Sequence, residues 1–283
     1  MKKVLVILVL VIMLFSVCAC SYVPSTRFLS RSQVDSLVKK YGTPQAELTI
    51  NYRLSSSSTD YEIKITYDLL LSQAPLAVIR FIQLANDGAY DNTVIDTYDS
   101  TYHYMIIGRY IYKDSVVSEN KKNWYVNNAL DTTFKGEFAS NNYREPKDGY
   151  AQFKTANGGF SLAMYHERYQ DENTTNFDTA NGAFILATRN ESLNPNNYAV
   201  FAQMVSMSYK VGNAEPDVTT RVNDTARANL EGFTSKTSQR KIYTDEEETD
   251  TIPSFSMMNQ IVTIKVRILG DNVDWSKLPQ IGR

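Results

Sequence analysis

The chain is poor in the residues from which covalent cross-links and metal sites are built. Its 283 residues include only two cysteines, Cys18 and Cys20, and only two histidines, His103 and His166. Both cysteines lie near the N-terminus, so the body of the chain can hold no internal disulfide. No cysteine cluster accompanies the histidines, which argues against a structural zinc site. An apolar core must therefore stabilise the protein, and its length suffices for one large domain with appendages.

The chain also lacks an excess of basic charge. Its 29 lysines and arginines are outnumbered by 31 acidic residues, which gives a formal net charge of -2. Proteins that bind nucleic acids neutralise phosphates with clustered Lys and Arg. The composition therefore argues against a nucleic-acid partner, and no sequence motif indicates a metal or another cofactor.

No apolar run reaches the roughly 20 residues that a transmembrane helix needs. The longest run, residues 4–17, follows Lys2 and Lys3 and leads into Cys20. A basic start, a short apolar segment and small residues before a cysteine are typical of a secretory signal. The segment resembles a bacterial lipoprotein signal, which implies removal of residues 1–19 and lipidation of Cys20. The alternative is an uncleaved N-terminal anchor, and in both cases the body lies outside the cytoplasm, attached to the cell membrane.

Residues 20–45 are expected to form a tether and an amphipathic helix. The tether is a short stretch that contains Ser and Pro. The helix is predicted over 32–41 because four apolar residues follow i, i+3, i+4, i+7 spacing and Gly42 stands where a C-cap belongs. The four residues are Val34, Leu37, Val38 and Tyr41.

The main domain is expected over residues 46–270 and is predicted to be mainly β. Segments 46–54 and 61–70 have the pattern of an antiparallel hairpin, and a helical pattern begins near Pro75. Five further short apolar runs predict strands at 101–111, 159–164, 183–187, 199–205 and 261–269. Many short strands with few helices indicate a closed antiparallel barrel.

A polar insertion is predicted at about 212–253, and residues 271–283 are expected to form a C-terminal tail. Within the insertion, a helix is predicted near 218–230. The acidic run at 245–248 is interpreted as a solvated loop. The alternative is a calcium site, although the run lacks the alternating ligand spacing of a calcium-binding loop.

Six segments keep one order within residues 49–211. They are Ala74 to Phe81, Gly88 to Thr93, Tyr104 to Gly108, Phe134 to Phe138, Gly159 to Met164, and Gly182 to Ile185. In this order they resemble the cyclophilin-type peptidyl-prolyl isomerases. The resemblance implies an eight-stranded antiparallel barrel closed by two helices.

Isomerases of this family accelerate rotation about the bond that precedes proline. Peptide-bond rotation costs about 18–20 kcal/mol because the nitrogen lone pair is delocalised, and X-Pro isomerisation takes tens to hundreds of seconds. A catalyst need only bind the twisted amide better than the planar forms. The resemblance implies an apolar pocket for the proline ring and an arginine that donates a hydrogen bond to the prolyl nitrogen.

The resemblance places the proline pocket at five residues. Tyr104, Met105, Phe184 and Leu193 match family positions that line the pocket, and Tyr198 matches a position that is His or Tyr in the family. The alternative for each residue is ordinary barrel core, and for Phe184 the two interpretations weigh equally. Tyr104 and Tyr198 favour the functional interpretation because a tyrosine hydroxyl needs polar surroundings.

The family's catalytic arginine has no counterpart in the expected segment. Thr97 is nearest to its position when one counts from Thr93, and Asp99 is the second candidate when one counts back from Met105. No arginine occurs between Thr93 and Tyr104. His103 and Arg109 are candidate replacements, although a loop histidine and a barrel-edge arginine are their simpler interpretations.

Two classes of function follow from these residues. The first is a membrane-anchored peptidyl-prolyl isomerase that assists the folding of exported proteins, with a reduced rate. The second is a non-catalytic module that binds proline-containing polypeptides. A third interpretation is a structural or adhesive lipoprotein, but no residue indicates which partner it would bind.

Overall fold

The computed structural model of the protein describes residues 22–23, 27–53, 59–99, 103–113, 116–120, 135–137, 143, 159–166, 182–189, 198–234, 238–241, 251–254, 263–270 and 273–281. The backbone alone is described at residues 22–23, 96–98, 113, 116–117, 119, 232–234, 238–241, 251–254 and 280. Cys18, Cys20, Leu193 and the acidic run at 245–248 lie outside these ranges.

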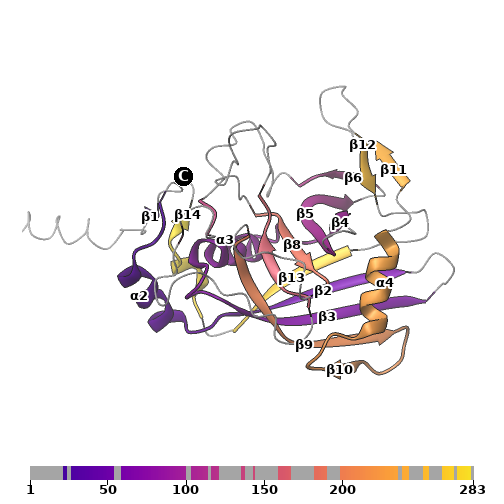
Figure 1. The fold of residues 1–283 in the computed structure, drawn as a ribbon, viewed down its shortest axis with the longest axis horizontal. Coiled ribbons are helices and arrows are strands. Elements are labelled where there is room, and N and C mark those ends of the chain that lie inside the picture. The colour runs from indigo at the N-terminus through magenta and orange to yellow at the C-terminus, as the bar shows by residue number, and fades with distance from the viewer. Residues whose placement is uncertain are drawn as a thin grey trace, which may run out of the picture.

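Eight antiparallel strands form a closed barrel, as the sequence predicts (Figure 1). Around the barrel the strand order is β9, β3, β2, β13, β4, β5, β8 and β7, and β7 pairs again with β9. Their bounds are β2 (Gln45–Arg53), β3 (Asp60–Leu69), β4 (Thr93–Asp99), β5 (Tyr104–Lys113), β7 (Leu162–Met164), β8 (Phe184–Ala187), β9 (Val200–Val211) and β13 (Thr263–Leu269).

Four further strands extend or accompany the barrel. Strand β6 (Val116–Glu119) pairs with β5, and β10 (Asp217–Thr219) pairs with β9. Strands β11 (Ser238–Lys241) and β12 (Thr251–Ser254) form a separate antiparallel pair.

Side chains that point inward from alternate positions of the strands fill the barrel. Along β2 every second residue is buried, and Leu48 and Ile50 pair directly with Ile65 and Ile63 of β3. Because successive side chains of a strand point to opposite faces, this pattern sends one set of residues into the core and leaves the other set outside.

Helix α3 (Pro75–Asn86) covers one end of the barrel and is anchored by a buried carboxylate. Its first turn contains Pro75, as expected for a helix start. The Glu137 carboxylate accepts hydrogen bonds from the backbone N–H groups of Leu76 and Ala77, both at 3.0 Å. Burial raises the pKa of Glu137 to about 8, although these two donors oppose the rise.

Helix α4 (Asp224–Thr234) lies at the opposite end of the barrel in Figure 1. It belongs to the predicted insertion, yet Ala226 and Leu230 are fully buried in the main core. The predicted helix start near 218 is wrong, because Val218 pairs with Ser208 as part of β10. The helix starts later, where the Asn223 side chain accepts a hydrogen bond from the Ala226 N–H at 3.0 Å, as an N-cap does.

The N-terminal helix α2 (Arg31–Tyr41) forms where the apolar spacing predicts it. Ser30 and Gln33 make a reciprocal capping box at its start, and Gly42 follows its end with a positive φ of 66°. None of the helices in the described ranges is long and apolar enough to cross a membrane.

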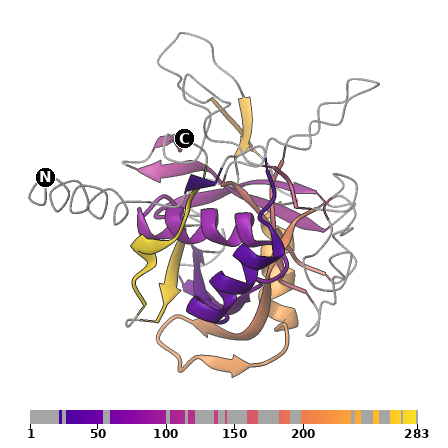
Figure 2. The same ribbon diagram turned by 90° about the vertical axis from the view of Figure 1, so that its left-hand side faces the viewer.

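The two ends of the described chain pair with each other. Strand β1 (Tyr22–Val23), within the predicted tether, is parallel to β14 (Gln280–Ile281), within the predicted tail. Figure 2 shows β1 close to α2 and α3 at this end of the molecule. Tyr22 and Val23 are therefore held against the domain rather than forming part of a free tether.

Candidate functional site

The sheet formed by β5, β7, β8 and β9 carries two apolar clusters that alternate along the strands. One set of residues belongs to the main core: Met105, Ile107, Leu162, Met164, Phe184, Leu186 and Phe201. The intervening residues form a second cluster, here called the outer cluster: Ile106, Ala163, Ile185, Ala187, Tyr198 and Val200, with Tyr104 and Tyr165 packed against them. Because neighbours in a strand point to opposite faces, the outer cluster lies on the outside of the barrel.

The outer cluster brings two of the five predicted pocket residues together. The rings of Tyr104 and Tyr198 lie 6.3 Å apart, centroid to centroid, at an interplanar angle of 60°. Ile106 and Ile185, which are direct partners across β5 and β8, belong to the same cluster. Two aromatic rings over an aliphatic floor provide the kind of surface against which a proline ring packs.

The other described pocket residues, Met105 and Phe184, point into the barrel. Phe184 is fully buried, and its ring meets Phe81 and Tyr90 edge to face at centroid distances of 5.6 and 5.2 Å. Met105 is also fully buried in the main core. The sheet therefore separates these two residues from Tyr104 and Tyr198, and Ile185 stands on the outer face instead.

Arg109 contacts Tyr165, which packs at the edge of the outer cluster. Its guanidinium carbon lies 5.0 Å from the centre of the Tyr165 ring, and Nη1 donates to the Tyr165 hydroxyl at 3.5 Å. Strict alternation from Ile107 would turn Arg109 toward the interior. Gly108, with a φ of 101°, interrupts the alternation in a conformation that favours glycine.

His103 lies at the other end of this sheet, beside α4. Its Nδ1 is 4.0 Å from Oε1 of Glu231, and its backbone carbonyl accepts hydrogen bonds from the N–H and hydroxyl of Thr188 at 2.8 and 2.9 Å. Arg189 donates to both Glu231 oxygens, at 3.1 and 2.9 Å. Burial raises the pKa of Glu231, but the bonds from Arg189 and Thr188 outweigh it and lower the pKa overall.

The position nearest to the family's arginine lies beside the outer cluster. In the β4–β5 pairing, Thr97 is the backbone partner of Ile106, and Asp99 is the partner of Tyr104. Both candidate positions therefore adjoin strand residues whose side chains contribute to the outer cluster. Leu193 lies outside the described residues, so its predicted role is unchanged.

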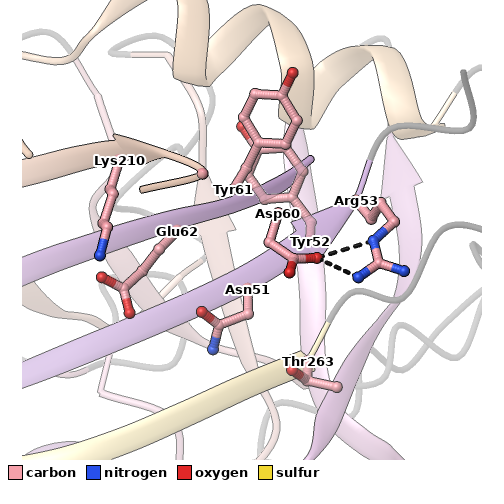
Figure 3. Close-up of a pocket in the computed structure, with 9 residues that line it drawn as sticks. Asn51, Tyr52, Arg53, Asp60, Tyr61, Glu62, Lys210 and Thr263 are labelled. Atoms are coloured by element: carbon pink, nitrogen blue, oxygen red, sulfur yellow. Dashed lines mark hydrogen bonds and ion pairs between the residues drawn. The ribbon is translucent and has the colours of Figure 1, made fainter. Parts of the chain in front are cut away.

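A pocket of about 400 Å³ lies at the end of the β2–β3 hairpin and shares no residue with the predicted site (Figure 3). Its lining residues are Asn51, Tyr52, Arg53, Asp60, Tyr61, Glu62, Lys210, Gly212 and Thr263. Two ion pairs involve residues of this pocket: Arg53 donates twice to one Asp60 oxygen, at 2.8 and 2.6 Å, and Glu62 lies 3.2 Å from Lys64. Within the described ranges, no group of His, Cys, Asp and Glu side chains is placed to hold a metal ion.

The family model of the cyclophilin-type peptidyl-prolyl cis-trans isomerases matches residues 55–229, more than half of the chain. The chain belongs to this family. A search of curated proteins finds no match to the sequence.

Solved cyclophilin structures are similar to this chain at low sequence identity. A Cryptosporidium parvum cyclophilin-type isomerase is 14% identical, covers 79% of this chain and 98% of its own, and has a TM-score of 0.37. The Mimivirus cyclophilin is 12% identical over 80% and 89% of the two chains, with a TM-score of 0.36. A bacterial cyclophilin from Hirschia baltica is 10% identical over 84% and 99%, with a TM-score of 0.29.

Proposed function

We propose that the protein is a peptidyl-prolyl isomerase, anchored outside the cytoplasm by a lipid on Cys20, that acts on proline-containing segments of exported proteins. The observation that supports this proposal most directly is the Tyr104–Tyr198 pair on the outer face of a cyclophilin barrel. The proline ring packs against these rings and the aliphatic side chains beneath them. The rest of the peptide follows the outer surface of β5.

Catalysis in this site needs a donor for the prolyl nitrogen as its lone pair localises. Arg109 is the candidate, because its stacking on Tyr165 holds a permanently charged guanidinium at the edge of the outer cluster. His103 is the weaker candidate because it faces Glu231 across the α4 contact. A donor that stabilises only the twisted amide lowers the barrier without tightening substrate binding.

A protease-coupled isomerisation assay on a short X-Pro peptide tests the donor. Arg109→Ala should lower kcat/KM by on the order of 10²–10³, the usual cost of one preorganised donor. His103→Ala should have a small effect, and Arg267→Ala, an exposed residue of β13, serves as the matched control. Wild-type activity near that of ordinary cyclophilins, unchanged by both Arg109→Ala and His103→Ala, would show that the donor lies elsewhere.

The alternative is a module that binds proline-containing segments without isomerising them. The absence of arginine from residues 93–104 favours it. The Ala-Pro dipeptide, in whose presence a Cryptosporidium parvum cyclophilin structure was determined, is a suitable first probe for titration calorimetry. Binding that Tyr198→Ala weakens, without turnover, would support this alternative. If no proline-dependent binding occurs at millimolar peptide, both functions fail.

The lipid anchor is tested by replacing each cysteine. A single acyl chain gives marginal membrane binding, and a lipoprotein's diacylglyceryl cysteine provides stable attachment. Cys20→Ser should therefore release the protein from membranes or block its processing, whereas Cys18→Ser should do neither. Membrane retention of a processed Cys20→Ser protein would contradict lipidation at this residue.

A further inference from the structure

The molecule has one end at which its N-terminal and C-terminal segments meet. This surface, here called the α2 end, comprises β1, residues 27–41 with α2, and residues 273–281 with the 3-10 helix η3 (Trp275–Lys277) and β14. Figure 2 views the molecule from the side on which α2 and β1 lie. Helix α4 lies at the opposite end of the barrel (Figure 1).

Contacts join these segments into one continuous surface. The ring of Tyr41, the last residue of α2, stacks on Trp275 with centroids 5.6 Å apart. Trp275 is the first residue of η3, and two residues separate η3 from β14. Gln83 of α3 donates to the carbonyl of Pro279 at 2.7 Å, which fixes the approach to β14. These contacts fix the end of α2, η3 and the approach to β14 within one part of the fold.

The α2 end lies close to the lipidation site that the proposed function places at Cys20. Tyr22 pairs with Gln280 and lies two positions after Cys20. Two fully extended residues span at most about 7 Å. Only a short stretch of chain therefore joins a lipid on Cys20 to the α2 end, and this short stretch holds the α2 end at the membrane surface.

The charge of the α2 end differs in sign from that of the whole chain. Residues 27–41 and 273–281 contain five basic side chains, Arg27, Arg31, Lys39, Lys40 and Lys277, against two acidic ones, Asp35 and Asp274. Both acidic residues lie within salt-bridge distance of a basic neighbour, Asp35 at 3.9 Å from Arg31 and Asp274 at 3.0 Å from Lys277. The net charge of these segments is +3, whereas that of the chain is -2.

Lys39 and Lys40 are the exposed cations of the last turn of α2. Lys40 Nζ lies 4.8 Å from the centre of the Tyr41 ring, next to the half-buried Trp275. Lysines and a tryptophan side by side suit the headgroup region of a membrane, where amphipathic rings and basic side chains gather.

We infer that the α2 end rests on an anionic phospholipid surface, with Lys39 and Lys40 among the headgroups. This inference depends on the lipid anchor of the proposed function. In this orientation α4 faces away from the membrane, toward incoming polypeptides. The Tyr104 end of the outer cluster, which lies beside His103 and Glu231, faces the same way.

Fluorescence quenching on vesicles tests this orientation. The full-length lipidated protein is reconstituted into phosphatidylglycerol–phosphatidylcholine vesicles that carry a headgroup-attached quencher. In the lipidated protein Cys18 has been removed with the signal and the Cys20 sulfur carries the lipid, so an introduced cysteine is the single free thiol. A label on Ser36→Cys reports an exposed position of α2, and a label on Ala228→Cys reports an exposed position of α4. We expect several-fold stronger quenching at Ser36→Cys.

Charge reversal supplies the matched control. Lys39→Glu with Lys40→Glu should reduce quenching at Ser36→Cys, whereas Lys64→Glu with Lys210→Glu, the same charge change on β3 and β9, should not. Equal quenching at the two labels in a protein that floats with the vesicles would overturn the orientation and leave the anchor intact. A protein that does not float with vesicles would overturn the anchor and the orientation with it.

Discussion

The two faces of the sheet formed by β5, β7, β8 and β9 differ in what they pack against, although their residues alternate along the same strands. On the inner face, Phe184 packs edge to face against Phe81 and Tyr90, and no part of its ring is exposed. On the outer face, the half-buried Tyr104 lies beside Tyr198, which is itself buried together with the aliphatic residues of the outer cluster. The comparison teaches that in an apolar strand the phase of the alternation, rather than hydrophobicity, decides whether a residue joins the barrel core or the outer cluster.

The largest effect is expected from a change on the inner face. Phe184→Ala removes a fully buried ring and should lower the free energy of unfolding by about 3–5 kcal/mol. Peptide affinity should fall only as far as the folded fraction falls. Urea denaturation and peptide titration of the same variant measure both quantities.

Tyr104→Ala is the outer-face counterpart of this change. Because Tyr104 is half-buried, it should cost less stability but weaken proline-peptide affinity by on the order of tenfold, about 1.4 kcal/mol. The assignment of the two faces is wrong if Phe184→Ala abolishes binding in a folded protein while Tyr104→Ala leaves it unchanged.

A hydrogen-bond donor added to β4, beside the outer cluster, tests the same assignment of the two faces. Thr97→Arg should raise isomerase activity, by up to the 10²–10³ that one preorganised donor is worth elsewhere, because residue 97 pairs with Ile106 in the β4–β5 ladder. Asp99→Arg tests the second position, which pairs with Tyr104. Coupled isomerisation assays measure both variants. A rise with neither variant, in protein that still binds proline peptides, would argue against β4 as the source of a donor.

The buried Glu137 should make stability depend on pH. Its pKa is raised from 4.5 to about 8, so the folded protein keeps a proton on this carboxyl in a pH range where the unfolded chain has lost it. The contribution of Glu137 to the free energy of unfolding should therefore fall as pH rises through this range, by at most about 1.4 kcal/mol per pH unit. Denaturation at several pH values should show a smaller dependence in Glu137→Gln, and an unchanged dependence would contradict the raised pKa.

The smallest effect is expected from two buried tyrosines that differ in one hydrogen bond. Within the described residues the Tyr67 hydroxyl has no hydrogen-bond partner, whereas the Tyr90 hydroxyl donates to the carbonyl of Gly182 at 2.7 Å. Tyr67→Phe should leave stability unchanged or raise it by about 1 kcal/mol, and Tyr90→Phe should lower it by about 1 kcal/mol. Thermal unfolding distinguishes the two, and equal losses would indicate that the Tyr67 hydroxyl is also satisfied.

Most of the barrel was predictable because its signals are local. The helix that begins near residue 32 and the strands at 46–54 and 61–70 follow from apolar periodicity and agree with α2, β2 and β3 to within one residue at each end. The order of the six family segments predicted the closed barrel. The start of α4 was missed because nothing local to Val218 reveals its pairing with Ser208 in β10.

The candidate site was predicted only in part. Tyr104 and Tyr198 could be found from the resemblance, but Ile185 could not, because Phe184–Ala187 is apolar throughout and gives no alternation to read. Pairing with β5 decides which face each residue of β8 occupies, because Ile106 pairs with Ile185 and Ile107 pairs with Phe184. The link from Arg109 to the cluster was also hidden, since it depends on the positive φ of Gly108 and on Tyr165, which follows β7 and is distant in sequence.

The sequence by itself determined the family, the barrel and the lack of an arginine between Thr93 and Tyr104. These are properties of residue identity and order, which need no knowledge of distant contacts. Only the tertiary structure decided which side of the sheet each residue faces, that Glu231 of the predicted insertion lies beside His103, and that Tyr22 pairs with Gln280. The physical reason is that strand pairing joins segments far apart in sequence, and a shift of one residue in register exchanges the two faces.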